Sequence, residues 1–191
     1  STTAMRLAEY NVFDTVVLTD ILEGKPEGLA LDMNQSRSIE GFETKIIGAT
    51  TTADGAGYEA TANSDVVVIT AGLPRKPGMS RDDLLTANAN IVSPATTESL
   101  KYSPDAIFIV LTNPLDTMAY LTMKKTGLPR ERVIGQAGIL DSARMRAFVA
   151  METGVSVENI DCYVLGGHGD EMVPLTRHSN IAGVPLKDYV A

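Results

Sequence analysis

Apolar residues recur along the chain in short continuous runs that alternate with segments of helical periodicity. Five such runs occur, at residues 15–19, 44–49, 64–72, 106–111 and 132–135. A continuous β-branched run of this length is typical of a strand buried on both faces, and hence of a parallel sheet covered by helices. The helical segments between the runs are predicted at residues 1–9, 23–34, 81–102 and 114–126. Pro94 is expected to kink or split the third of these helices. The alternation predicts an α/β protein with a doubly wound, Rossmann-type parallel sheet.

The first strand of such a sheet is expected to be missing. The sequence opens in the helical segment 1–9, and no Gly-x-Gly-x-x-Gly turn, which would follow a first strand, occurs in the chain. A different kind of segment begins near Gln136. We therefore expect residues 1–135 to form a dinucleotide-binding domain shortened at its N-terminus. Residues 136–191 are expected to begin an α+β substrate domain that is shortened at its C-terminus.

Composition excludes several classes of partner. The 191 residues carry a net charge of −8, which argues against nucleic acid or an anionic membrane as a partner but not against small anions. No apolar run approaches the length of a membrane span. The single cysteine, Cys162, excludes an internal disulfide and fits a reducing compartment, so a cytoplasmic location is expected. Cys162, His168 and His178 do not have a zinc spacing, and no metal is expected.

A glycine-rich turn with a histidine offers the most specific candidate chemistry. The apolar run 160–165 leads into Gly-Gly-His-Gly-Asp, which places His168 at the end of a predicted strand. Strand ends of this kind carry chemistry in α/β enzymes, although a surface turn with an incidental histidine has the same pattern. Asp141 and Arg144 share one face of a predicted helix. They form either a surface ion pair or part of a site in which Asp141 couples to His168.

Other polar residues follow the predicted strands. Asp20 closes the first apolar run, where a dinucleotide fold holds the adenosine ribose, but a solvated acid in a loop is equally consistent. Arg75 and Arg81 lie in a proline- and glycine-containing loop that either closes on an anion or is a solvated basic loop. Asn113 follows the strand 106–111 and is aimed either at a ligand or into a turn before proline.

Five motifs stand together in the order seen in one family. They are Thr70-Ala71-Gly72, the segment 74–81 (Pro-Arg-Lys-Pro-Gly-Met-Ser-Arg), the segment 113–116 (Asn-Pro-Leu-Asp), the segment 141–144 (Asp-Ser-Ala-Arg) and the segment 166–170 (Gly-Gly-His-Gly-Asp). In this order they resemble the 2-hydroxy-acid dehydrogenases, and among these the NAD-dependent malate dehydrogenases of the lactate-dehydrogenase-like type. The resemblance covers nearly the whole chain.

The resemblance implies catalytic roles for His168 and Asp141 and substrate-binding roles for Arg144 and Arg81. His168 matches the family's proton donor and acceptor, a task that suits histidine because its ordinary pKa is about 6.5. Asp141 matches the carboxylate that orients the imidazole and stabilises its protonated form. Arg144 matches the bidentate clamp on the substrate's C1 carboxylate. Arg81 matches the loop arginine that polarises the reacting carbonyl once the loop closes.

The resemblance also implies NAD as cofactor. Asp20 matches the acid that binds the adenosine ribose, and it would repel the 2′-phosphate of NADP. Asn113 matches a residue that touches both the substrate and the nicotinamide ribose. The remaining cofactor-contacting positions that match are Thr70, Ala71, Gly72, Asn88, Leu111 and Thr112.

Arg75 separates substrates within the family. A cation there complements the second carboxylate of malate or oxaloacetate, whereas pyruvate would leave it unpaired, at a cost of several kcal/mol. We therefore expect the malate–oxaloacetate reaction. The resemblance further implies a place in the tricarboxylic acid cycle and a homodimer or homotetramer. The alternatives are a lactate-type dehydrogenase and a non-catalytic nucleotide-binding or assembly fragment. The 191 residues in isolation are expected to be inactive.

Overall fold

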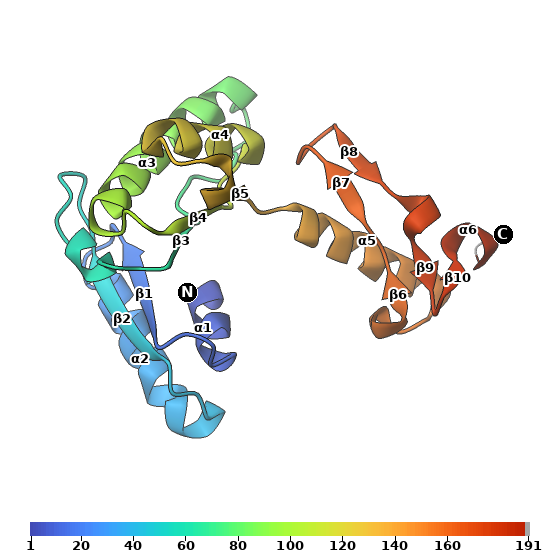
Figure 1. Ribbon diagram of the computed structural model, residues 1–191, viewed down its shortest axis with the longest axis horizontal. Coiled ribbons are helices and arrows are strands. Elements are labelled where there is room, and N and C mark those ends of the chain that lie inside the picture. The colour runs from blue at the N-terminus through green and yellow to red at the C-terminus, as the bar shows by residue number, and fades with distance from the viewer. Residues whose placement is uncertain (190–191) are drawn as a thin grey trace. The chain divides into compact units, whose positions relative to one another are not determined.

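The computed structural model describes residues 1–189, in which helices and strands alternate through the first two thirds of the chain (Figure 1). The helices are α1 (Thr2–Glu9), α2 (Lys25–Glu40), α3 (Arg81–Tyr102), α4 (Leu115–Thr126), α5 (Gly138–Thr153) and α6 (Leu186–Tyr189). The strands are β1 (Thr15–Asp20), β2 (Lys45–Thr50), β3 (Val66–Ile69), β4 (Ile107–Val110), β5 (Val133–Gly135), β6 (Ile160–Asp161), β7 (Val164–Gly166), β8 (Met172–Pro174), β9 (Asn180–Ile181) and β10 (Val184–Pro185). Short 3₁₀ turns are η1 (Tyr58–Thr61), η2 (Arg130–Arg132), η3 (Val157–Asn159) and η4 (Thr176–His178).

Each of the five predicted apolar runs overlaps a strand, and each predicted helical segment overlaps a helix, although α2 continues to Glu40, beyond the predicted end at residue 34. The predicted split of α3 at Pro94 is wrong, because the helix continues from Arg81 to Tyr102. Val92 and Thr96 on either side of the proline are fully buried. Packing at these positions outweighs the roughly 3 kcal/mol that a proline costs inside a helix.

The parallel character of the predicted sheet is confirmed. β1 and β2 pair in parallel from Thr15↔Lys45 to Asp20↔Thr50, and β4 and β5 pair in parallel. β3, β4 and β5 form a three-stranded sheet in that order, and β1 and β2 form a separate two-stranded sheet. The parallel strands of the doubly wound arrangement are therefore divided between two sheets.

The chain divides into two compact units, and the first contains residues 1–67 and 93–107. In this unit α2 lies along the β1–β2 pair (Figure 1), and the apolar faces of α1, α2 and β2 meet in one core. Its buried members are Ala4, Ala8, Ala30, Met33, Phe42 and Ile46. Gly48 of β2 permits the close approach of α2, because a Cβ there would overlap the Pro26 carbonyl.

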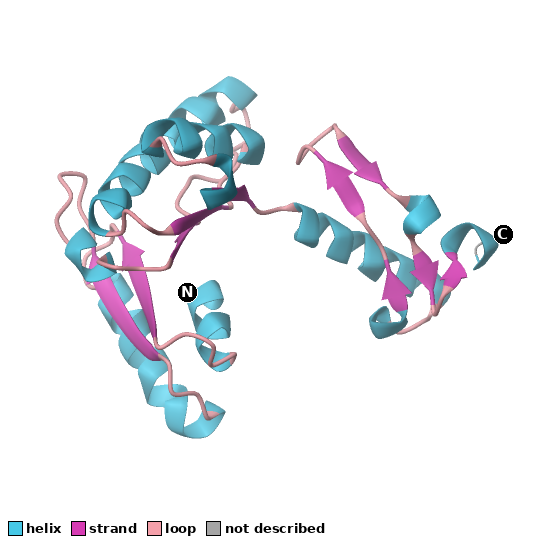
Figure 2. Ribbon diagram, in the orientation of Figure 1, coloured by secondary structure: helices cyan, strands magenta, loops and turns pink. Residues whose placement is uncertain are grey.

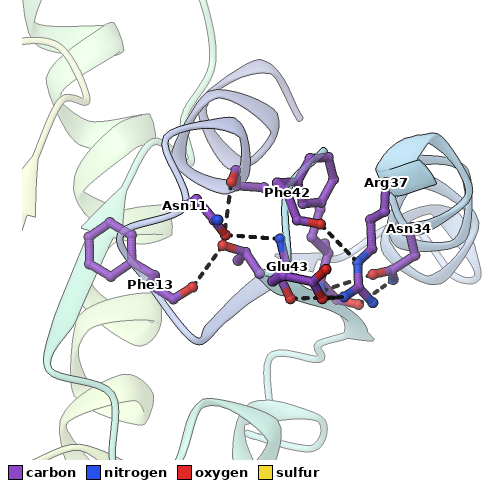
Figure 3. A network of polar contacts seen from close by, with 9 residues as sticks. Asn11, Phe13, Asn34, Arg37, Phe42 and Glu43 are labelled. Atoms are coloured by element: carbon purple, nitrogen blue, oxygen red, sulfur yellow. Dashed lines mark hydrogen bonds and ion pairs between the residues drawn. The ribbon is translucent and has the colours of Figure 1, made fainter. Parts of the chain in front are cut away.

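A polar network ties the end of α2 to the start of β2 (Figure 3). The Asn34 side chain pairs with the backbone of Ile46 in β2, donating to its carbonyl at 2.6 Å and accepting from its N–H at 3.1 Å. The Arg37 guanidinium donates to the Glu43 carbonyl and carboxylate, both at 2.9 Å. The buried Thr44 hydroxyl donates to the Phe13 carbonyl at 2.7 Å. These bonds stabilise α2 beyond residue 34, where the predicted helix ended.

The second unit contains residues 68–92 and the chain from Phe108 onward. After β5 the pattern changes to the helices α5 and α6 with short antiparallel strands, shown in magenta in Figure 2. α5 packs on β6 and β7 around the buried Ile160, Cys162 and Ile181. This part confirms the predicted change to an α+β arrangement. Among residues 1–189, no helix has both the length and the apolar character needed to cross a membrane.

Candidate active site

His168 lies in the tight turn that joins β7 to β8. Gly166 opens this turn with a φ of +93°, and a Cβ there would overlap the Glu171 carbonyl, so only glycine suits the position. The Gly169 N–H donates to the Gly167 carbonyl at 3.0 Å, and the Met172 N–H donates to the Gly169 carbonyl at 3.2 Å. The β7–β8 strand pair and the glycine turn together position the imidazole of His168.

Asp141 binds the His168 ring. The distance from Nδ1 of His168 to Oδ2 of Asp141 is 2.7 Å, and the two side chains are 19% and 8% exposed. Asp141 lies in the first turn of α5, and its neighbour Ser142 accepts a hydrogen bond from the Val164 N–H at 3.0 Å. That second bond fixes α5 to the strand that carries the histidine. Because Nδ1 is engaged by the carboxylate, Nε2 is the nitrogen left for chemistry.

Arg144 contacts the other oxygen of the same carboxylate. Its Nη1 lies 3.4 Å from Oδ1 of Asp141, while the arginine side chain stays 58% exposed. The geometry is a single long contact and not a bidentate pair, so most of the guanidinium donors remain accessible to an anion. His168, Asp141 and Arg144, which are spread over 28 residues of sequence, are thus in direct contact through one carboxylate.

The basic loop ends on a well-formed helix start. The Ser80 hydroxyl and N–H both donate to Oδ2 of Asp83, at 2.7 and 3.0 Å, and the Asp83 N–H donates back to the Ser80 hydroxyl at 3.0 Å. The Ser80 hydroxyl and backbone N–H hold the pKa of the Asp83 carboxyl below its ordinary value. This reciprocal cap fixes the backbone at Arg81, the first residue of α3.

The two loop arginines have different partners. Arg81 Nη2 lies 2.9 Å from Oδ2 of Asp170, two residues beyond His168, and both side chains are largely exposed. Arg75 donates from Nε to the Met79 carbonyl at 3.1 Å and is exposed. The structure therefore brings Arg81 beside the histidine turn, whereas Arg75 is held within its own loop.

Asn88 links the carboxyl ends of β3 and β4. Its side chain is 1% exposed and accepts from the Leu73 N–H at 2.7 Å while donating to the Leu73 carbonyl at 3.2 Å. A third bond runs from Nδ2 to the carbonyl of Asn113 at 2.6 Å. Asn113 itself is exposed and begins the cis peptide bond to Pro114. Asn88 thus holds the backbone on which Asn113 is presented.

The other predicted cofactor positions divide by exposure. Thr70, Ala71 and Gly72 are exposed after β3, and Leu111 is half-buried. Thr112 is buried, and its hydroxyl donates to the Ala71 carbonyl at 2.7 Å. The Thr112 side chain therefore holds the two strand ends together.

Asp20 belongs to the first unit, at the carboxyl end of β1. Its Oδ2 lies 2.9 Å from the Lys25 ammonium, and its Oδ1 accepts from the Leu22 N–H at 3.1 Å. Partial burial opposes ionisation, but Lys25 and the backbone N–H groups of Leu22 and Ile21 outweigh it and lower the pKa of the Asp20 carboxyl. The residue is a partly exposed carboxylate at a strand end, as the sequence predicted.

Sequence reasoning missed four polar contacts around the site. Asp170 binds Arg81, Ser142 binds β7, Asn88 binds two strand ends, and Asp116 accepts from the His168 N–H at 2.9 Å. Three of these residues lie inside the motifs that the sequence singled out. Their positions were visible, but their partners, up to 89 residues away, were not.

Comparison with known proteins covers both units. The sequence pattern described as the lactate/malate dehydrogenase NAD-binding domain matches residues 1–135, and that of the lactate/malate dehydrogenase alpha/beta C-terminal domain matches residues 139–191. Malate dehydrogenase of Synechocystis sp. is 56% identical over 189 residues, covering 99% of this chain and 56% of the relative. Malate dehydrogenase of Chloroherpeton thalassium is 50% identical, covering 100% of this chain and 59% of the relative.

Solved structures agree with this assignment. Malate dehydrogenase from Picrophilus torridus has a TM-score of 0.91 at 46% identity, covering 98% of this chain and 57% of that chain. Lactate dehydrogenase from Cryptosporidium parvum, complexed with lactic acid and nicotinamide adenine dinucleotide, has a TM-score of 0.88 at 41% identity, covering 99% and 57%. This chain thus spans little more than half the length of these relatives. With its two parts matched in order by the two domain patterns, the chain belongs to the lactate/malate dehydrogenase family.

Proposed function

We propose that the enzyme carrying this chain interconverts malate and oxaloacetate with NAD. The observation that carries the proposal is the contact between His168 and Asp141, 2.7 Å apart, with Arg144 on the same carboxylate. A half-buried imidazole coupled to a buried acid is suited to proton transfer, and an adjacent exposed arginine is suited to an organic anion. The family assignment and the malate dehydrogenase relatives support the same reaction.

The residues at the strand ends fit NAD. Asp20 offers a partly exposed carboxylate, which suits the two hydroxyls of an adenosine ribose and disfavours a 2′-phosphate. Thr70, Ala71 and Gly72 are exposed, and Asn113 is an exposed residue whose amide would contact the nicotinamide ribose. When bound, NAD accepts or donates the hydride of the reaction. The buried Asn88 and Thr112 act here by holding the backbone of these groups.

The proton of the reaction is assigned to Nε2 of His168. In the direction of reduction, the protonated imidazole donates this proton to the carbonyl oxygen of oxaloacetate, and in oxidation it takes the proton from the hydroxyl of malate. The Asp141 carboxylate accepts the Nδ1–H and stabilises the imidazolium. Because Asp141 is buried, this stabilisation acts in a medium of low dielectric constant.

Three arginines are assigned to the anionic substrate. Arg144 would hold the C1 carboxylate, since most of its donors are not used by Asp141. Arg81 would leave Asp170 to polarise the carbonyl, and Arg75 would pair with the second carboxylate. All three side chains are exposed, so substrate binding has to order them.

Substrate preference tests the proposal. We expect kcat/KM with NADH to favour oxaloacetate over pyruvate by about a thousandfold, because pyruvate leaves Arg75 unpaired. Arg75→Gln should shrink this ratio, whereas Lys76→Gln, a cation lost from the same loop, should leave it within about threefold. A preference for pyruvate, or an unchanged ratio in Arg75→Gln, would overturn the substrate assignment.

A second pair of variants tests the proton donor. The chain has two histidines, and His178 is exposed and distant in sequence from the motif. His168→Asn should lower kcat/KM by roughly a thousandfold, as expected for loss of general acid–base catalysis, whereas His178→Asn should retain it. Full turnover in His168→Asn, or activity with neither substrate in the unmodified enzyme, would contradict the proposed reaction.

The remaining assignments rest on the family and on composition. We propose residues 1–135 as the dinucleotide-binding domain, residues 136–191 as part of the substrate domain, and a cytoplasmic homodimer or homotetramer as the working form. Large exposed apolar residues on α5, such as Phe148 and Met151, are consistent with a covered face in an assembly. Light scattering of the purified enzyme measures the oligomeric state, and a monomer at micromolar concentration would refute that part.

A further inference from the structure

The hydrogen bond between Asp116 and the His168 backbone links two motifs that the proposed reaction uses separately. Asp116 is the second residue of α4 and follows Asn113 by three residues. Its Oδ2 accepts from the His168 N–H at 2.9 Å, across 52 residues of sequence. From these contacts we infer that Asp116 is a positioning residue, which holds the proton donor at a fixed distance from Asn113. This inference rests on the proposed function.

The histidine turn needs such an anchor. It joins two strands of three residues each, β7 and β8, and a short two-stranded hairpin is marginally stable by itself. Within the turn, the Gly169 N–H donates to the Gly167 carbonyl and the Met172 N–H donates to the Gly169 carbonyl, so both bonds join residues that are close in sequence. Asp141 fixes only the ring of His168, through Nδ1. A rotation of the turn about that ring contact would displace the His168 backbone. The hydrogen bond from the His168 N–H to Asp116 opposes this rotation.

The chemistry of the contact suits this task. A backbone N–H bonded to an ionised carboxylate forms a charge-assisted hydrogen bond, which is stronger than a bond to a neutral acceptor. Asp116 is itself well placed, since a carboxylate in the first turn of a helix is stabilised by the helix dipole. The turn also approaches closely, because a Cβ on Gly167 would lie 3.5 Å from Oδ2 of Asp116.

Asn113 completes the link. Its carbonyl is held by the buried Asn88, and the helix that Asp116 occupies begins two residues later. The proposed reaction assigns Asn113 to the substrate and nicotinamide side, and His168 to the proton. Asp116 thereby joins Asn113, which the proposal places at the nicotinamide ribose, to the group that supplies the proton, through one helix start.

Two variants of Asp116 separate positioning from charge. Asp116→Ala removes the acceptor and should lower kcat about 10- to 100-fold with little change in the KM for NADH, since a displacement of about 1 Å costs on this order. Asp116→Asn keeps an amide oxygen as acceptor and should restore kcat to within about fivefold of the unmodified enzyme. Equal losses in both variants would show that charge, and not position, matters and would overturn the inference. So would a kcat unchanged in Asp116→Ala.

Hydrogen exchange tests the anchor without reference to activity. In Asp116→Ala the amides of the turn, residues 166–171, should exchange at least roughly tenfold faster than in the unmodified enzyme. Asp82→Ala is the matched control, because Asp82 is the exposed second residue of α3 and its loss weakens a helix start without touching the turn. Unchanged exchange in Asp116→Ala would refute the anchor. If the amides of Asp116→Ala exchange faster but the unmodified enzyme is inactive with oxaloacetate, the anchor is retained and the proposed reaction is refuted.

Discussion

Replacement of Asn88 by aspartate tests the link between the two strand ends most directly. In the structure the Asn88 amide donates to two carbonyls, Leu73 O at 3.2 Å and Asn113 O at 2.6 Å, and accepts from one N–H at 2.7 Å. The side chain is 1% exposed. Asn88→Asp has the same shape but turns a carboxylate oxygen toward both carbonyls, where water cannot reach to compensate.

The cost of the substitution has two parts. The aspartate escapes the buried charge by binding a proton, which at pH 7 costs about 4 kcal/mol for a group with an ordinary pKa near 3.9. The protonated acid then donates one hydrogen bond where the amide donated two, which costs about 1 kcal/mol more. We expect Asn88→Asp to lower the free energy of unfolding by about 5 kcal/mol at pH 7.

The sign of the pH dependence distinguishes this mechanism from simple disruption. The folded state raises the pKa of the new carboxyl, so the variant regains stability as pH falls toward the unfolded value. The deficit should shrink to about 2.5 kcal/mol at pH 5. Urea denaturation at pH 5, 6 and 7 measures it, with Asn90→Asp as control, because Asn90 is exposed on the same helix. A deficit that is independent of pH, or below about 1 kcal/mol at pH 7, would refute the reasoning.

Three further changes probe the scaffold. Ser80→Ala should lower the free energy of unfolding by about 1 kcal/mol at pH 7. Because the folded state lowers the pKa of Asp83, this loss should become smaller as the pH falls through that pKa. A loss that is independent of pH would contradict the cap. Thr44→Val removes the 2.7 Å bond to the Phe13 carbonyl and should lower the free energy of unfolding, measured by urea denaturation, by about 1–3 kcal/mol. An unchanged urea midpoint would show that this bond does not stabilise the fold. Gly48→Ala places a Cβ against the backbone of α2 and should cost about 1–3 kcal/mol, whereas a stabilised variant would show that α2 can retreat.

The sequence predicts strands well here because parallel strands tend to have continuous apolar runs. The expected burial on both faces is not reached, since β1 has no fully buried residue and β5 is largely exposed. Helix ends are less visible. The part of α2 beyond Asn34 is polar, and its stability comes from Asn34 and Arg37 bonding to residues at the start of β2. Pro94 shows the reverse case, in which a strong local signal yields to packing at neighbouring buried positions. Local rules fail at both places because the deciding contacts are tertiary.

The same division applies to the site. Asp141 and Arg144 were predicted to share a helix face because an i,i+3 spacing fixes that relation within one element. The contacts of Asp116 with His168 and of Asn88 with Asn113 join different elements, so spacing carries no information about them. Asn88 was matched to a cofactor-contacting position, but in the structure its amide is fully engaged with the backbone of Leu73 and Asn113.

The site divides into fixed and free groups, and this division has a kinetic consequence. The His168 ring and backbone each have a carboxylate partner, and the Asn113 carbonyl has the buried Asn88. Arg81 and Arg144 are exposed and make one ion pair each. Preorganised groups lower the barrier of the chemical step, whereas exposed side chains have to be ordered by the substrate they bind. Substitutions that loosen the fixed groups should therefore act mainly on kcat, and substitutions of the arginines should also raise KM, because the free energy that orders them comes from the substrate.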